Sequence, residues 1–434
     1  MRQKLLRDGA NELNYEIRGI VKKAEQLRPY FPEIFWENIG DPIAKHQEVP
    51  QWMKESIAGL LMEDATYGYS HSKGLLATRE YLANLTNVRK GAHISADDIT
   101  FFNGLGDAIG KIYQYLLPTS RVIGPSPAYS THSSAEAAHA NHHPITYMLD
   151  PNNSWYPDLD DLYNKVKYNP QIVGILIINP DNPTGMVYPR AILERMVAIA
   201  REFDLFIICD EIYLNITYNR QPSHALCEYI GDVPGIALKG ISKEFPWPGA
   251  RCGWVEYYNR GRDKEFDRLC QTLDNAKMME VSSTKLPQLA IPKIMEDSRY
   301  LAFRQEFNAK IGARAQRISE ILSPVQSITF NQTNGAFYNT IIFKEGALRQ
   351  GQHLHITKPE ARLLLDGWLH DELPLDKRFV YYLLAAKGIC VVPVSSFCSD
   401  LLGFRVTLLE NTPEKLEYIF STIIEAIEEY VASA

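Results

Sequence analysis

Two stretches of the chain decide the fold: IVGILIINPDNPTG, from Ile172 to Gly185, and LFIICDEIY, from Leu205 to Tyr213. Each begins with a short apolar run and passes directly into polar residues. We expect buried strands over Val173–Ile178 and Leu205–Cys209, because strands buried on both faces read as continuous apolar runs. Between them, Arg190–Phe203 has apolar residues at helical spacing. A strand, a helix and a second strand in this order predict a parallel βαβ unit.

The same alternation continues on both sides, from about residue 99 to about residue 260. Further helical patterns cover Asp107–Leu117 and Asp158–Tyr168. Together with the two strands above, the expected strands are Ile99–Phe102, Arg121–Gly124, Ile145–Met148, Ile236–Lys239 and Cys252–Glu256. The sequence therefore predicts an α/β fold with a mainly parallel seven-stranded sheet that carries helices on both faces.

A different pattern begins near residue 300. A long helix is expected over Tyr300–Leu322 and a last helix from Pro413. The short strands expected between these helices are Ala336–Phe343, Ile389–Val392 and Phe404–Leu408. Residues 344–376 are irregular and charged, and we expect a peripheral loop with one helix there. This mixture predicts a smaller α+β domain.

The domain organisation that follows has three parts. Residues 1–50 form an N-terminal arm or lid that contributes to the small domain. Residues 51–300 form the large α/β domain, and residues 301–434 form the small α+β domain. A chain of 434 residues is long enough for two or three domains.

Composition narrows the class of function. Hydrophobic residues make up 45% and charged residues 22%, which is typical of a folded globular protein. The net charge is −7 and no basic stripe is present, so a nucleic-acid partner is not expected. No apolar run approaches the roughly 20 residues of a membrane span, and no secretory signal is expected. The six cysteines lack CxxC spacing, which favours reduced thiols in the cytoplasm.

A glycine-rich turn, GLGDAIG (Gly104 to Gly110), lies where a strand ends and a helix begins. Backbone N–H groups at such a helix start can hold a phosphate. The alternative is a purely structural turn. A dinucleotide site would require an acidic residue about 20 positions later, but Lys111 to Ala135 contains no Asp or Glu. A proline-stiffened turn further on presents the ring of Tyr129.

Polar side chains follow three more strands of the predicted sheet. Asn182 follows one strand, and Asp210 with Tyr213 follows the next. Lys243 comes after a further strand, eight residues before Arg251. Each has an ordinary alternative role: Asn182 as a turn residue before proline, Asp210 as a helix cap, and Lys243 as a surface charge. Ligands of open α/β sheets bind beyond the carboxyl ends of the strands, so these side chains are expected to meet.

The combination points to one cofactor. A lysine, an anion for a pyridinium nitrogen, donors for a phenolic oxygen and a phosphate-holding turn are the parts needed to bind pyridoxal 5′-phosphate. With these motifs in this order, from NIGDP (Asn38 to Pro42) to GFRVTLLE near the C-terminus, the sequence resembles the class I/II aminotransferases. These are fold type I pyridoxal-phosphate enzymes, and the resemblance covers nearly the whole chain.

The resemblance implies roles for the residues around the cofactor ring. It makes Lys243 the residue that binds the cofactor covalently, and Asp210 the partner that keeps the pyridine nitrogen protonated. Tyr213 and Asn182 match the donors to the ring oxygen, and Tyr129 matches the ring that stacks on the cofactor face. Lys243, Asp210 and Tyr213 are the implied catalytic residues.

The resemblance also implies the phosphate and substrate contacts. The groups matched to the phosphate are the backbone N–H groups of Leu105 and Gly106 and the side chain of Arg251. Tyr69, in YGYSHSKG, matches a tyrosine donated by the neighbouring subunit, so a homodimer is expected. Gly40 matches the strip that lines the substrate site. Arg405 matches the arginine that binds the substrate α-carboxylate in a bidentate manner.

The opening stretch LNYEIRGIV (Leu13 to Val21) is similar to that of bacterial alanine (glutamate–pyruvate) aminotransferases. In those relatives the segment matching Tyr15 and Arg18 closes over the active site and contacts the substrate. The alternative for this segment is an ordinary amphipathic helix. Arg18 is our candidate for the distal carboxylate of glutamate, because AKMMEVSSTKLP offers no arginine for that role.

The expected activity is transfer of an amino group between an L-amino acid and a 2-oxo acid by a ping-pong mechanism, with alanine and glutamate as favoured donors. Two alternatives stay open: a C–S lyase that performs β-elimination on the same fold, and a catalytically inactive module that only binds the cofactor. No metal site is expected, because Asn141–His143 and His353–His355 lack further ligands at metal-binding spacing.

Overall fold

The structure is a computed structural model that describes residues 5–13 and 16–433. Its centre is an eight-stranded sheet with the strand order β2-β9-β8-β7-β6-β3-β4-β5. The bounds of these strands are β2 Ile99–Phe102, β3 Arg121–Ser126, β4 Thr146–Asp150, β5 Tyr156–Pro157, β6 Ile172–Ile178, β7 Phe206–Asp210, β8 Gly235–Gly240 and β9 Gly253–Tyr258. All seven predicted strands are present. The eighth, β5, is an antiparallel edge strand of two residues.

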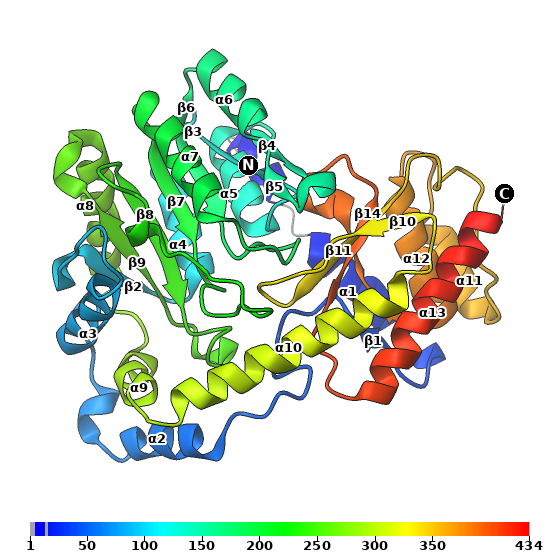
Figure 1. The fold of residues 1–434 in the computed structure, drawn as a ribbon, viewed down its shortest axis with the longest axis horizontal. Coiled ribbons are helices and arrows are strands. Elements are labelled where there is room, and N and C mark those ends of the chain that lie inside the picture. Colours follow the sequence, from blue (N-terminus) through cyan, green and yellow to red (C-terminus); the bar gives the residue numbers. More distant parts are fainter. Residues whose placement is uncertain (1–4, 14–15, 434) are drawn as a thin grey trace.

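Helices cover both faces of this sheet, as Figure 1 shows. Alternate residues of β6 explain why both faces need cover. Leu176 and Ile178 pack with α4 (Leu105–Gln114) and α8 (Lys264–Met279), whereas Ile175 and Ile177 belong to the core on the other face. The other helices around the sheet are α2 Gln51–Leu61, α3 Leu76–Asn87, α5 Ser130–Ala140, α6 Leu159–Tyr168, α7 Arg190–Glu202 and α9 Lys285–Met295. The predicted doubly wound α/β architecture is confirmed.

A second core surrounds a four-stranded sheet with the order β10-β11-β14-β13. Its strands are β10 Ile328–Phe330, β11 Tyr338–Phe343, β13 Val392–Pro393 and β14 Gly403–Thr407, and a separate parallel pair joins β1 Phe35–Trp36 to β12 Ile389–Cys390. The helices around it are α1 Glu16–Leu27, α10 Tyr300–Leu322, α11 Pro359–Trp368, α12 Leu375–Lys387 and α13 Pro413–Ala432. This is the α+β part that the sequence predicts. Figure 1 shows α10 running from beside α9 toward α13.

The N-terminal arm divides between the two cores. The 3-10 helix Asp8–Glu12 packs on α5, where the backbone N–H of Gly9 donates to Asn141 Oδ1 at 2.6 Å. Farther along, Ile20, Ala24 and Leu27 of α1 are buried in the second core. The domain limits at residues 50 and 300 stay a prediction.

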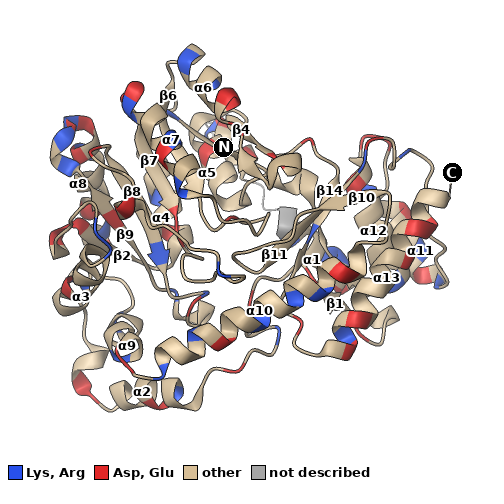
Figure 2. Ribbon diagram, in the orientation of Figure 1, with Lys and Arg blue, Asp and Glu red and all other residues tan. Residues whose placement is uncertain are grey.

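The distribution of charged and apolar residues along the helices bears on the kind of partner that the protein can have. In Figure 2, acidic and basic residues are interspersed along the helices of both parts. Among the residues that the structure describes, no helix combines the length and apolarity needed to cross a bilayer. Segment 344–376 contains the helix α11 and, at Leu375, the start of α12.

Candidate active site

The predicted site residues come together where the carboxyl ends of the central strands face the second core. Asp210 is the last residue of β7, and Lys243 follows β8 by three residues. Asn182 lies in the loop after β6, and Arg405 is the middle residue of β14. Arg405 Nη1 donates a hydrogen bond of 3.1 Å to Asn182 Oδ1, so the two parts of the protein meet at this point.

Asp210 is 3% exposed and is held from two sides. Its Oδ1 accepts from the backbone N–H of Ile212 at 3.1 Å, and His132 Nε2 lies 3.1 Å from its Oδ2. His132 is on α5, 78 positions away in the sequence, and is itself buried. Sequence reasoning missed His132, because no motif links it to Asp210. The pair presents a fixed carboxylate at the strand end.

Lys243 is half-buried, and its ammonium group donates a 2.5 Å hydrogen bond to the carbonyl of Gly40. Burial lowers the pKa of Lys243 to about 8. The value includes the effects of nearby charges: the cations Arg405 and Arg251 act in the same direction as burial, while Asp41 and Asp210 oppose the shift in pKa. A lysine with such a pKa supplies a substantial fraction of neutral amine near neutral pH, which nucleophilic and acid–base catalysis require.

The start of α4 and the Arg251 side chain form a cradle suited to a phosphate. Gly104, the residue before α4, has φ +86°, and a Cβ there would lie 2.5 Å from Arg251 Nη2. Glycine at position 104 therefore lets the guanidinium approach the helix start. A Cβ at Gly106 would meet nothing within 4 Å. The helix N-terminus and the guanidinium both favour an anion.

Arg405 is a buried cation whose contacts are neutral. It is 2% exposed, and its Nη2 donates to the carbonyl of Asn38 at 2.6 Å. Its guanidinium lies over the rings of Tyr338 and Phe397, at 4.2 and 5.1 Å from the ring centroids. Among the described residues it has no carboxylate within salt-bridge distance, and its Nε has no hydrogen-bond partner. A buried charge without a counter-ion is costly, which makes this an attractive position for a carboxylate ligand.

Two buried tyrosines lie in contact within the candidate site. The hydroxyl groups of Tyr213 and Tyr338 lie 3.0 Å apart. Burial raises the pKa of Tyr213 well above its usual value. A Cβ at Gly40 would overlap the Tyr338 hydroxyl, which explains why glycine is required in the strip predicted to line the site. Sequence reasoning did not identify Tyr338, which lies 125 positions from Tyr213.

The remaining predicted residues differ in how the structure places them. Tyr129 is half-buried, and its ring meets His132 edge to face at 6.4 Å between centroids. Tyr69 is 83% exposed. Arg18 is exposed on the first turn of α1, and Tyr15 lies outside the described residues. The structure thus brings the predicted cofactor residues of one chain together, but it does not bring Tyr69 or Arg18 to them.

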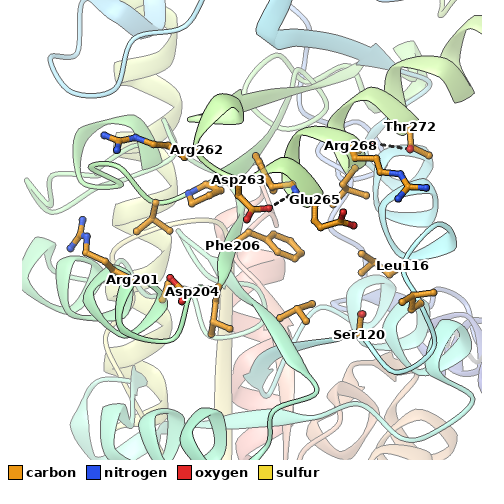
Figure 3. A pocket seen from close by; sticks show the side chains of 18 of the residues that line it. Leu116, Ser120, Arg201, Asp204, Phe206, Arg262, Asp263, Glu265, Arg268 and Thr272 are labelled. Carbon is orange, nitrogen blue, oxygen red and sulfur yellow. Dashed lines mark hydrogen bonds between the residues drawn. The ribbon is translucent and has the colours of Figure 1, made fainter.

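A separate pocket of about 760 Å³ opens at the other end of the central strands (Figure 3). Its residues include Val173, Phe206 and Pro234, at or beside the amino ends of β6, β7 and β8. The side chains labelled in Figure 3 include both arginines and carboxylates, so charged groups of both signs surround the pocket. None of the predicted cofactor or substrate residues lines this pocket, so it is distinct from the candidate active site.

Comparison with known proteins identifies the class. Residues 37–423 match the family described as aminotransferase class I and II. The chain belongs to this family, whose members depend on pyridoxal 5′-phosphate. It is therefore an aminotransferase, as the resemblance of its motifs implied.

Individual relatives agree with this assignment. The chain is 52% identical to an uncharacterised aminotransferase of Methanocaldococcus jannaschii, over 99% of this chain and 100% of that protein. It is 28% identical to the glutamate–pyruvate aminotransferase AlaA of Escherichia coli, over 75% and 79% of the two chains. The solved alanine aminotransferase of Pyrococcus furiosus superimposes with a TM-score of 0.84 at 24% identity, covering 98% of this chain and 100% of that one. This structural likeness confirms the fold.

Proposed function

We propose that this aminotransferase binds pyridoxal 5′-phosphate at the Lys243 site and transfers amino groups between alanine or glutamate and the corresponding 2-oxo acids. The observation that carries the proposal is Arg405, a buried cation that lacks a counter-ion among the described residues and that lies next to Asn182. An amino acid and its 2-oxo acid share the α-carboxylate that such a guanidinium binds.

The residues present fit the cofactor. The cradle of Gly104 and Arg251 suits its phosphate, the Asp210 carboxylate suits its ring nitrogen, and the Lys243 amine suits its aldehyde. Leu105 and Gly106 begin the helix that faces the phosphate position, and Tyr213, Asn182 and Tyr129 complete the set of ring contacts that we propose. When bound, pyridoxal 5′-phosphate supplies an electron sink that acidifies the substrate α-hydrogen.

The chain's own residues then carry out the proton transfers. Lys243 accepts the proton from the substrate α-carbon as a general base and returns a proton as a general acid, which its pKa of about 8 permits. Asp210 holds a proton on the ring nitrogen, and His132 fixes the orientation of Asp210. Arg405 holds the α-carboxylate. The overall reaction exchanges an amino group for an oxo group between two substrates, so it needs no external oxidant or reductant.

The choice of alanine and glutamate rests on the relatives. The aminotransferases of Escherichia coli and Haemophilus influenzae at 28% and 32% identity are named glutamate–pyruvate aminotransferases, and that of Mycobacterium tuberculosis at 32% identity is named alanine aminotransferase. We propose that Arg18, together with Tyr15, closes over the site and pairs with the distal carboxylate of glutamate. Arg18 is exposed on α1 and has no ion-pair partner among the described residues, so it is free to do so.

A panel of amino acids tests this function directly. The purified enzyme with bound cofactor should convert alanine and glutamate, paired with 2-oxoglutarate and pyruvate, with double-reciprocal plots that are parallel lines as a ping-pong mechanism requires. Activity confined to aspartate or to aromatic amino acids would contradict the substrate assignment. Release of pyruvate and ammonia from a cysteine derivative, without any 2-oxo acid, would instead indicate a C–S lyase.

Replacement of Arg18 by alanine should separate the two substrates. We expect KM for glutamate to rise about 10–100-fold, because one charge-assisted hydrogen-bonded pair is lost. KM for alanine should change less than about threefold, since alanine has no distal carboxylate. Steady-state kinetics with both donors measures the difference. Lys22→Ala, an exposed cation one turn later on α1, is the matched control and should change neither value. Equal losses for both donors in Arg18→Ala would contradict the role.

We also propose that the active unit is a homodimer in which Tyr69 completes the phosphate site of the partner. Large apolar side chains are exposed on the α2–α3 segment that contains Tyr69 and at the end of α8; they are Met62, Tyr67, Leu76, Met278, Met279 and Val281. Lys285 donates to the Ala65 carbonyl and ties this region to the start of α9. Nearby, the Thr284 N–H donates to Asn103 Oδ1, next to the cradle. Exposed apolar patches of this kind are typical of subunit interfaces.

Mixing two inactive variants tests this arrangement. A Lys243→Ala chain keeps Tyr69, and a Tyr69→Ala chain keeps Lys243, so a mixed dimer regains one complete site. With random exchange, about a quarter of the wild-type activity should return. Each variant incubated alone under the same exchange conditions is the control. An active monomer in sedimentation, or mixed dimers without any recovery, would contradict the proposal.

The cytoplasm is the proposed location. Among the described residues no disulfide forms, and all six cysteines except Cys398 are buried. Burial raises the pKa of five of them, Cys209, Cys227, Cys252, Cys270 and Cys390, which suppresses thiolate chemistry. Such unpaired thiols suit a reducing compartment.

A further inference from the structure

A buried charge network lies directly behind Asp210. Glu211, the next residue, is 3% exposed and faces away from Asp210, since successive side chains at a strand end alternate in direction. Its carboxylate accepts a hydrogen bond from the backbone N–H of Leu226, and its Oε2 lies 3.5 Å from the ammonium of Lys239. Burial raises the pKa of Glu211, and Lys239 opposes this shift, so the lysine helps to keep the carboxylate ionised.

Lys239 also pairs with a second buried carboxylate, Glu256, at 2.7 Å. The two acids are bound very differently. Glu256 accepts hydrogen bonds from Thr86 at 3.1 Å, Trp254 at 3.2 Å and Tyr258 at 2.5 Å. Oε2 of Glu211 has no hydrogen-bond partner among the described residues. Glu211 therefore depends on Lys239 and the Leu226 N–H, whereas Glu256 is held by several neighbours besides the lysine.

The backbone links this network to the cofactor side of the sheet. The Glu211 N–H donates to the carbonyl of Leu238 at 2.9 Å, and the Asp210 carbonyl accepts from the Asn179 N–H at 3.1 Å. Because Asp210 and Glu211 share a peptide unit, a shift of the Glu211 backbone is passed on to Asp210. A misplacement of about 1 Å at a reacting centre can cost about 100-fold in rate.

We infer that Glu211 is a positioning residue that, anchored by Lys239 and the Leu226 N–H, fixes the carboxylate of Asp210 against the cofactor ring. This inference rests on the proposed function, because it assumes that Asp210 faces bound cofactor. Glu211 does not touch substrate or cofactor and acts through its neighbour. Glu256 shares the same lysine but lies on β9, away from Asp210 in sequence, so we expect no such effect from it.

Glu211→Gln and Glu256→Gln form a matched pair that tests the inference. Each variant leaves Lys239 with one carboxylate, so both should lower Tm, and Glu256→Gln should lower it at least as much as Glu211→Gln because Glu256 accepts more hydrogen bonds. Only Glu211→Gln should raise Kd for pyridoxal 5′-phosphate, by about tenfold, as measured by equilibrium dialysis of the apoprotein. It should also lower kcat with little change in KM, because Arg405 and not Asp210 binds the substrate carboxylate.

Three outcomes distinguish the possibilities. Equal cofactor Kd values for the two variants would overturn the inference and reduce the network to a structural role. Failure of the wild-type protein to bind pyridoxal 5′-phosphate would instead overturn the proposed function. Where Glu211→Gln does not fold, Glu211→Asp replaces it: the charge is kept but the reach is shortened, and the same rise in Kd is expected. An Asp variant with wild-type cofactor affinity and kcat would contradict the inference.

Discussion

Lys243→Ala is expected to lower kcat for transamination by at least about 10⁴-fold, because Lys243 is both the proposed cofactor-binding amine and the proposed general base. The fold should persist, since Lys243 makes one side-chain hydrogen bond, to the Gly40 carbonyl, at the edge of the core. Single-turnover kinetics with the cofactor-saturated variant measures the residual rate. Circular dichroism and Tm show whether the fold is intact.

Chemical labelling checks the assignment independently of activity. Borohydride treatment of the cofactor-loaded wild-type protein should label the peptide that contains Lys243. Lys293→Ala, which removes a lysine with a half-exposed side chain that pairs only with Glu63 at 3.5 Å, is the control and should keep full activity and labelling. Labelling of another lysine, or wild-type turnover by Lys243→Ala, would show that the wrong residue was assigned.

Arg405→Lys is expected to lower kcat/KM by about 10²–10⁴-fold for every amino acid donor. A lysine keeps the charge but cannot donate the two parallel hydrogen bonds that a carboxylate accepts, and each charge-assisted bond contributes about 1.5–3 kcal/mol. The loss should be similar for alanine and glutamate, because both present the same α-carboxylate. Steady-state kinetics with both donors is the measurement.

A control in the same part of the protein separates binding from folding. Arg314 is a partly buried guanidinium on α10 that donates to the Leu408 carbonyl and to Asn411. Arg314→Lys should destabilise the fold about as much as Arg405→Lys and leave kcat/KM close to the wild-type value. Retention of wild-type kcat/KM by Arg405→Lys would rule out Arg405 as the carboxylate site.

Local sequence patterns predicted the regular elements well. The helix over Tyr300–Leu322 has the predicted ends, and the last helix begins at Pro413 as expected. The buried strands β6 and β7 are recognisable because both of their faces are apolar. Strand β5 has only two residues and pairs at an edge, so it carries no periodic signal. The predicted helix start at Asp107 lies two residues after the observed start of α4 at Leu105. The positive φ of Gly104, which ends the preceding turn, cannot be read from composition.

The candidate site was predictable where a motif carries the chemistry and unpredictable where the chemistry is made by distant contacts. Lys243, Asp210 and Asn182 follow strands of one sheet and could be placed together from the sequence. His132 and Tyr338 reach the site across 78 and 125 positions and stand in no recognisable motif. Their contribution depends on how α5 and β11 pack, which a single sequence does not show.

The contacts of Arg405 have a consequence for how this protein can change. Its guanidinium joins three segments remote in the chain, at Asn38, Asn182 and β14 itself, so the group that we propose to bind the substrate carboxylate also holds these segments together. Substitutions of Arg405 are therefore expected to lower both substrate binding and the stability of the fold. Arg18 is exposed, and α1 is anchored by other residues, Ile20 and Leu27. Changes in the preferred side chain of the substrate are therefore expected to arise through substitutions on the outer face of α1, while Arg405 stays unchanged.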